Sequence, residues 1–129
     1  MSVERWDPDA HIDLLGSWLA ERGQAADAGD ARLYPSTGFV VDRCAIGFVY
    51  ATNAPLVGYL DGIVTDPSAS ARRRLVALEE LCDLLVDEAE KLGIALLYAN
   101  TNIRGLVRIC RRAGFVTYGS GFECVVKVR

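Results

Sequence analysis

The sequence has few of the residues on which metal sites depend. Its 129 residues include a single histidine, and its four cysteines stand 38, 28 and 14 residues apart. Zinc ligands usually occur at short spacings such as Cys-x-x-Cys, so we expect no metal site. Each cysteine lies in an apolar stretch, which favours buried free thiols in a reducing compartment. These cysteines are Cys44, Cys82, Cys110 and Cys124.

Long hydrophobic runs are also absent. The longest apolar run falls far short of the roughly 18 residues that a membrane helix needs. Residues 2–6 show no basic region leading into an apolar one, as a signal peptide would. With 51% hydrophobic and 24% charged residues, the composition is typical of a globular protein. We therefore expect one domain over residues 1–129, soluble and cytoplasmic, with no membrane partner.

There is no excess of positive charge, but the basic residues are unevenly placed. A net charge of −3 argues against nucleic acid as a general partner. Seven of the fourteen lysines and arginines fall in two stretches, Arg72-Arg73-Arg74 and residues 104–112. Local positive charge on an acidic protein predicts a discrete anionic ligand.

The hydrophobic pattern predicts alternating strands and helices. Asp7-Pro8 is typical of a helix start, and this helix should end near Gly23. Asp66-Pro67-Ser68 should start the longest helix, whose apolar residues repeat at spacings of 3 and 4 up to Gly93. Asn102 is a candidate cap for a helix over 103–113. Strands are expected over residues 2–6, 39–41, 45–51, 56–64, 94–99, 115–118 and 122–128.

This order of elements resembles the GNAT N-acetyltransferase superfamily. Leu60 to Val64, then Thr65-Asp66-Pro67 and a long helix, resemble its central strand, V-x-P turn and cofactor helix. Strand 94–99, the short helix and Ala113-Gly114-Phe115 resemble its fifth strand, fourth helix and GF ending. The resemblance implies an α/β fold with a mixed central sheet of about six or seven strands and about four helices.

Three short segments are similar to small GNAT-like proteins encoded by tailed bacteriophages. These segments are Tyr34-Pro35-Ser36-Thr37-Gly38, Tyr50-Ala51-Thr52-Asn53 and Asp66-Pro67. This second resemblance implies a phage protein working in the cytoplasm of a host cell.

The superfamily resemblance implies acetyl-CoA as co-substrate, with its pyrophosphate at the turn after Pro67. That turn normally reads Q/R-x-x-G-x-G/A, but Arg73 and Leu75 stand at the glycine positions here, and their Cβ atoms narrow the cradle. Arg72, Arg73 and Arg74 oppose the helix macrodipole and have no acidic residue three or four positions away. They therefore indicate a bound anion.

The same arginines have a second interpretation, in which they are solvated or pair with distant acids such as Asp66 or Glu123. Further cofactor contacts are implied by the resemblance. Arg104 and Arg108 begin a row on the short helix that would face the same cleft. The backbone of Val64 and the side chain of Asn100 would bind the thioester and pantetheine portions, although Asn100 could equally cap the following helix.

Two residues are candidates for acetyl-transfer chemistry. Asp61 is the only charged residue within Leu56 to Val64, so it could accept the amine proton. It could instead bond a backbone N–H or point to solvent. Cys110 stands where the superfamily has a tyrosine that protonates the leaving thiolate, and packing is its alternative role.

Two functions follow from these residues. The first is an acyl-CoA-dependent N-acetyltransferase whose acceptor is a small amine or a protein amino group. The second is a catalytically inactive GNAT-fold binding or assembly module, which the lost glycines and tyrosine favour. Exposed strand edges leave a homodimer open.

Overall fold

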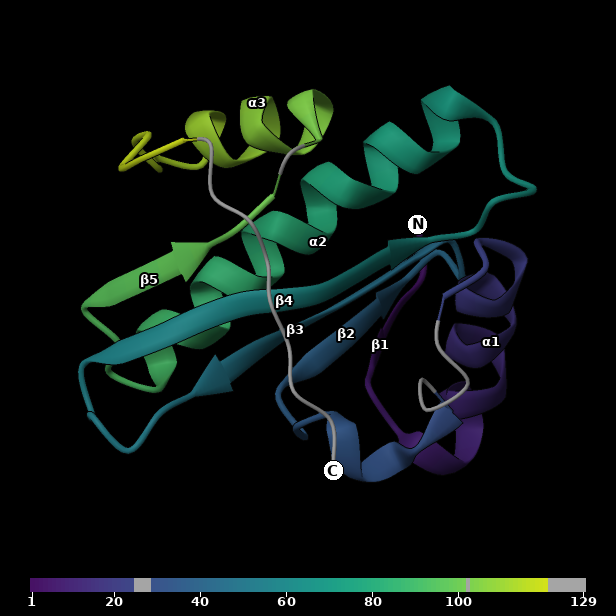
Figure 1. The fold of residues 1–129 in the computed structure, drawn as a ribbon, viewed down its shortest axis with the longest axis horizontal. Helices are drawn as coiled ribbons and strands as arrows, with labels where there is room; N and C mark the ends of the chain where they lie inside the picture. The colour runs from purple at the N-terminus through teal and green to yellow at the C-terminus, as the bar shows by residue number, and fades with distance from the viewer. Residues whose placement is uncertain (25–28, 102, 121–129) are drawn as a thin grey trace.

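The computed structural model describes residues 1–24, 29–101 and 103–120, and its centre is a mixed β-sheet (Figure 1). The described strands follow the order β1-β2-β3-β4-β5, with antiparallel pairing up to β4 and parallel pairing of β4 with β5. The predicted α/β class is confirmed. The elements are β1 (Val3–Arg5), α1 (Pro8–Glu21), a short 3-10 helix (Ala31–Leu33), β2 (Gly38–Val41), β3 (Ala45–Ala51), β4 (Val57–Thr65), α2 (Ala71–Lys91), β5 (Leu96–Ala99) and α3 (Arg104–Arg112).

Local sequence explains where the helices begin. Asp7 caps α1 by accepting a hydrogen bond from the Asp9 N–H at 3.1 Å, as the Asp-Pro pair predicts. The longest helix starts later than predicted. Ser70 is its N-cap and accepts from the Arg73 N–H at 3.2 Å, while Asp66 closes the preceding turn through Ser68. The predicted caps were therefore right for α1 and displaced by four residues for α2.

The sheet is covered on both faces (Figure 1). One apolar layer joins α2 to the sheet, and a second joins α1 to the opposite face around Trp18 and Phe48. A third layer joins α3 to α2. The buried face of α2 is shifted slightly around the helix from the apolar face that the spacings of 3 and 4 predict. Leu81 is buried, whereas Leu75 and Leu92 are 45% and 43% exposed. No helix in the described ranges is long and apolar enough to cross a membrane.

The turn between β2 and β3 is a tight hairpin through Asp42 and Arg43. Both residues have a positive φ, of 52° and 45°, and the Cys44 N–H donates to the Val41 carbonyl at 2.9 Å. One strand prediction is wrong, because residues 115–118 form no strand. Within the described residues β5 lies at the sheet edge with Leu96 50% exposed. The predicted strand 122–128 and Asn102 fall outside the described residues.

β4 carries an irregularity that positions the site. Between the pairs Ile46↔Val64 and Phe48↔Asp61, β3 advances by two residues and β4 by three. The extra residue is a β-bulge, and Gly62 takes a φ of 64° there. Gly62 suits this position because residues with a Cβ atom rarely adopt such a conformation.

Candidate functional site

The candidate site begins where β5 leaves β4. The last pair of the parallel ladder is Leu60↔Ala99, and β4 continues to Thr65 without a strand on that side among the described residues. Backbone groups alternate sides along a strand. Since the Asp66 N–H donates to the Cys44 carbonyl on the β3 side, the Val64 N–H also faces β3. The N–H groups of Ile63 and Thr65 then face the open side, whereas the thioester role of Val64 stays a prediction.

The first turn of α2 follows the end of β4 and carries the predicted arginines. Arg72 is exposed, and its guanidinium makes no hydrogen bond or ion pair within the described residues. Arg74 is half-buried, and its Nε is fully buried without a hydrogen-bond partner. A buried orphan donor is costly, by about 1–3 kcal/mol, so Arg74 marks a place where an acceptor would be stabilised.

Arg73 already has a partner among the described residues, which is Asp42 rather than Asp66, and Glu123 falls outside those residues. Its Nη2 donates to the Asp42 carbonyl at 2.9 Å, and its Nε lies 3.4 Å from Asp42 Oδ2. Arg22, which sequence reasoning missed, reaches the same place from the end of α1 and donates to Thr65 Oγ1 at 3.2 Å. Arg22 and Arg73 both lower the pKa of Asp66, although its hydrogen bonds with Ser68 contribute more.

The second basic group lies on α3. Arg104 and Arg108 are exposed and form no ion pair within the described part of the chain, whereas Arg112 pairs with Glu79 of α2 at 3.0 Å. Asn100 is exposed after the end of β5. It does not cap α3, because Ile103 is the N-cap residue of that helix. The cofactor roles of Arg104, Arg108 and Asn100 stay predictions.

Asp61 lies on the open stretch of β4, just before the bulge. Its carboxylate is exposed, and its Oδ1 accepts a hydrogen bond from the Gly62 N–H at 2.7 Å. The contact leaves Oδ2 available, so both the expected backbone bond and a proton-accepting role are compatible with this geometry. Burial raises the pKa of Tyr50 to about 12, and the nearby negative charge of Asp61 adds to that rise. The Asp61 carboxylate therefore sits close to the Tyr50 hydroxyl.

Cys110 does not face this open stretch. It is 6% exposed and packs between α3 and α2 in a layer with Cys82 and Ile109. The hydrogen bond and charge interaction with Cys110, together with burial, raise the pKa of Cys82. These surroundings favour the packing interpretation, and the catalytic role of Cys110 stays a prediction. Among the described cysteines all three are free and buried.

We expect Cys110→Ala to lower the free energy of unfolding by about 1–2 kcal/mol, because it removes a buried group from a close-packed layer. Chemical denaturation of the variant and of Cys44→Ala, whose thiol packs in a different layer, measures this effect. Unchanged stability would show that Cys110 is not a packing residue and would revive its role as an acid.

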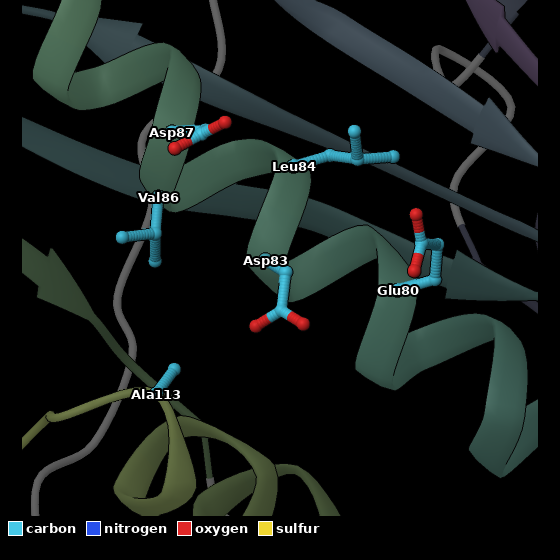
Figure 2. Close-up of a pocket in the computed structure, with 6 residues that line it drawn as sticks. All are labelled: Glu80, Asp83, Leu84, Val86, Asp87 and Ala113. Carbon is cyan, nitrogen blue, oxygen red and sulfur yellow. The ribbon is translucent and has the colours of Figure 1, made fainter.

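A shallow groove between α2 and α3 lies apart from these residues (Figure 2). Three carboxylates on one face of α2 line it, together with Leu84, Val86 and Ala113. Negative charges repel phosphate groups, so this groove is not the place for the predicted anion. The carboxylates are Glu80, Asp83 and Asp87.

Comparison with known proteins gives structural matches only. No family model and no curated protein sequence matches the chain. A mutant of TTHA1254 from Thermus thermophilus is 13% identical with a TM-score of 0.73, over 100% of this chain and 99% of that one. Ribosomal-protein-alanine N-acetyltransferase from Brucella melitensis is 16% identical with a TM-score of 0.64, over 97% and 98%. The chain has the GNAT fold.

A third match concerns the cofactor. Rv2747 from Mycobacterium tuberculosis, whose structure is a complex with CoA, is 12% identical with a TM-score of 0.72, over 95% of this chain and 76% of that one. At such identities the GNAT likeness establishes the fold alone. Activity and ligand must be argued from the residues of this chain.

Proposed function

We propose that this chain is an acetyl-CoA-dependent N-acetyltransferase that acetylates a primary amine of a small molecule or a protein. One observation carries the proposal. A single strand, β4, bears an available carboxylate on its open stretch and ends at a turn where the Arg72 guanidinium is exposed and the buried Nε of Arg74 has no hydrogen-bond partner. From Asp61 to Asp66 the strand extends about 16 Å, so an anion held at the turn and an acetyl group near Asp61 suit one long ligand.

The residues of the turn fit the anionic end of coenzyme A. Ser70 satisfies only the Arg73 N–H by its side chain, so the Ala71 and Arg72 N–H groups remain for a phosphate at the start of α2. The buried Nε of Arg74 offers a further donor. Side chains thus replace the donors that a glycine-rich turn would supply through its backbone.

Each group has a distinct task in this mechanism. Acetyl-CoA would supply an activated acetyl thioester. The N–H groups of Ile63 and Thr65 orient its carbonyl oxygen and stabilise the negative charge that develops there. Asp61 accepts a proton from the substrate ammonium, directly or through water. The neutral amine nitrogen then bonds to the carbonyl carbon, the carbon–sulfur bond breaks, and the thiolate takes up the further proton that the nitrogen releases as the amide forms.

Arg72→Glu should weaken acetyl-CoA binding at least tenfold in calorimetric titration at moderate salt. Loss of a charge-assisted hydrogen bond is worth about 1.5–3 kcal/mol, and the reversed charge adds repulsion. Arg32→Glu is the matched control, because Arg32 is exposed and pairs with Asp30 in the short 3-10 helix rather than in the α2 turn. It changes the net charge equally and should leave the affinity within twofold.

The outcome separates the two functions. Micromolar binding that only the Arg72 variant loses supports the cofactor site. No heat and no thermal shift at millimolar acetyl-CoA would refute the acyltransferase proposal.

The alternative function is a catalytically inactive GNAT-fold binding or assembly module. The engagement of Arg73 with Asp42 favours it, because this arginine is held by the protein rather than left for a phosphate. Such a module would suit the phage protein that the short segments resemble. A pull-down with the whole chain, made where acetyl-CoA fails to bind, would identify its partner.

A further inference from the structure

Three tyrosines form an exposed aromatic surface beside Asp61, here called the tyrosine ledge (Tyr59, Tyr98 and Tyr118). Tyr59 of β4 and Tyr98 of β5 are register partners whose rings stack at 5.4 Å with 25° between their planes. Tyr118 meets Tyr98 edge-on at 6.1 Å. Tyr59 is 38% exposed and Tyr118 is 87% exposed, so ring surface is accessible in a part of the fold with little other aromatic exposure.

Strand alternation defines the face on which the ledge lies. Leu60 and Ala99 follow Tyr59 and Tyr98 and pack in the α2 layer, so the ledge is on the opposite face. α1 covers that face over β2 and β3, where Val40 and Phe48 are fully buried. The ledge therefore extends the α1 face of the sheet beyond the cover of the helix.

Asp61 belongs to the same face. It lies two residues after Tyr59, and its register partner is Phe48 of the α1 layer. Tyr50, the β3 partner of Tyr59, points its hydroxyl at the Leu33 carbonyl, 3.2 Å away, and lies near the Asp61 carboxylate. The arginines of the α2 turn, by contrast, lie beyond the end of β4. The α1 face thus combines one carboxylate with aromatic rings.

We infer that the tyrosine ledge and Asp61 form the acceptor subsite, and that the acceptor is a cationic amine carrying an aromatic body. The inference rests on the proposed function and names its substrate class. An ammonium group is attracted both to a carboxylate and to tyrosine ring faces. A flat ring attached to it by a short chain can stack on Tyr59 and Tyr98. A phosphate or carboxylate on the acceptor would be repelled by Asp61.

The test compares acceptors of different chemistry with wild-type protein and saturating acetyl-CoA. Phenethylamine should show a kcat/KM at least tenfold above those of glucosamine-6-phosphate and glutamate. Tyr98→Leu should raise the KM for phenethylamine roughly tenfold while the Kd for acetyl-CoA stays within twofold, because it removes a ring stacked on Tyr59 and leaves every arginine in place. Val116→Ala, at an 84% exposed position outside the ledge, is the control and should change neither.

A second measurement detects the subsite without turnover. Phenethylamine should produce saturable shifts of tyrosine ring signals in NMR spectra of the wild-type protein, and Tyr98→Leu should abolish them. Equal or better turnover of glucosamine-6-phosphate would overturn the inference and leave the acetyltransferase proposal standing. Ring shifts with no turnover of any amine would retain the subsite and refute the proposed function. Absence of both shifts and phenethylamine turnover would overturn the subsite.

Discussion

Asp61→Asn should reduce kcat for acetyl transfer at pH 7 by about 10²–10⁴, the usual contribution of a positioned general base. Asparagine keeps the size of the side chain and can still accept a hydrogen bond from the Gly62 N–H through its amide oxygen. It cannot take a proton from the substrate ammonium. The affinity for acetyl-CoA should remain within twofold, because Asp61 lies about 16 Å along β4 from the arginine turn. Thiol release with phenethylamine measures the rate.

The pH dependence tests the role further. An alkylamine has a pKa near that of lysine, about 10.4, so raising the pH makes a growing share of the acceptor neutral without help from the enzyme. The difference in kcat between wild type and Asp61→Asn should therefore become smaller as the pH approaches 10. Asp13→Asn, an exposed position on α1, is the matched control. A rate within twofold of wild type at pH 7 would show that Asp61 is not the base.

Gly62→Ala should lower the free energy of unfolding by about 2–5 kcal/mol. The left-handed conformation contributes about 1–2 kcal/mol with any side chain, and overpacking a core typically adds 1–3. A Cβ on Gly62 would lie 2.8 Å from Cδ2 of Phe48. Phe48 has little room to move, because it is fully buried between the rings of Trp6 and Tyr34. Denaturant titration monitored by circular dichroism gives the value.

Gly93→Ala separates the two contributions. Gly93 has a φ of 76°, and a Cβ added there would meet no atom within 4 Å, so its substitution introduces backbone strain alone. We expect a loss of about 1–2 kcal/mol there. If Gly62→Ala and Gly93→Ala lower the free energy of unfolding equally, the Phe48 side chain moves away from the new methyl group at no measurable cost. If Gly62→Ala lowers the free energy of unfolding by less than 1 kcal/mol, Gly62 does not hold a left-handed conformation packed against Phe48.

Short-range signals predicted much of the fold. The Asp7-Pro8 helix start depends on a side chain that caps the adjacent backbone, so it can be predicted from a few neighbouring residues. The position of β5 could not, because an apolar strand looks alike whether its neighbours cover one side or both. Residues 115–118 are all β-branched or aromatic, as is typical of a strand, yet pairing depends on a partner that local sequence does not reveal.

The candidate site was only partly predictable for the same reason. The arginine run at the start of α2 is visible in sequence, but the Arg73–Asp42 contact joins residues 31 positions apart. The packing of Cys110 against Cys82 likewise depends on how α3 lies on α2. One missed feature did have a signal, since Gly62 inside an apolar strand is typical of a bulge.

The bulge also divides β4 into two halves that differ in parity, meaning whether the even-numbered or the odd-numbered residues face α2. Before it, the even-numbered Leu60 packs toward α2; after it, the odd-numbered Ile63 does so and Val64 packs toward α1. Deleting one residue within the first half would exchange the environments of Tyr59 and Leu60 while the arginine turn kept its place. Insertions or deletions of two residues preserve parity. Among sequences derived from this one, length changes in β4 should therefore survive in even steps.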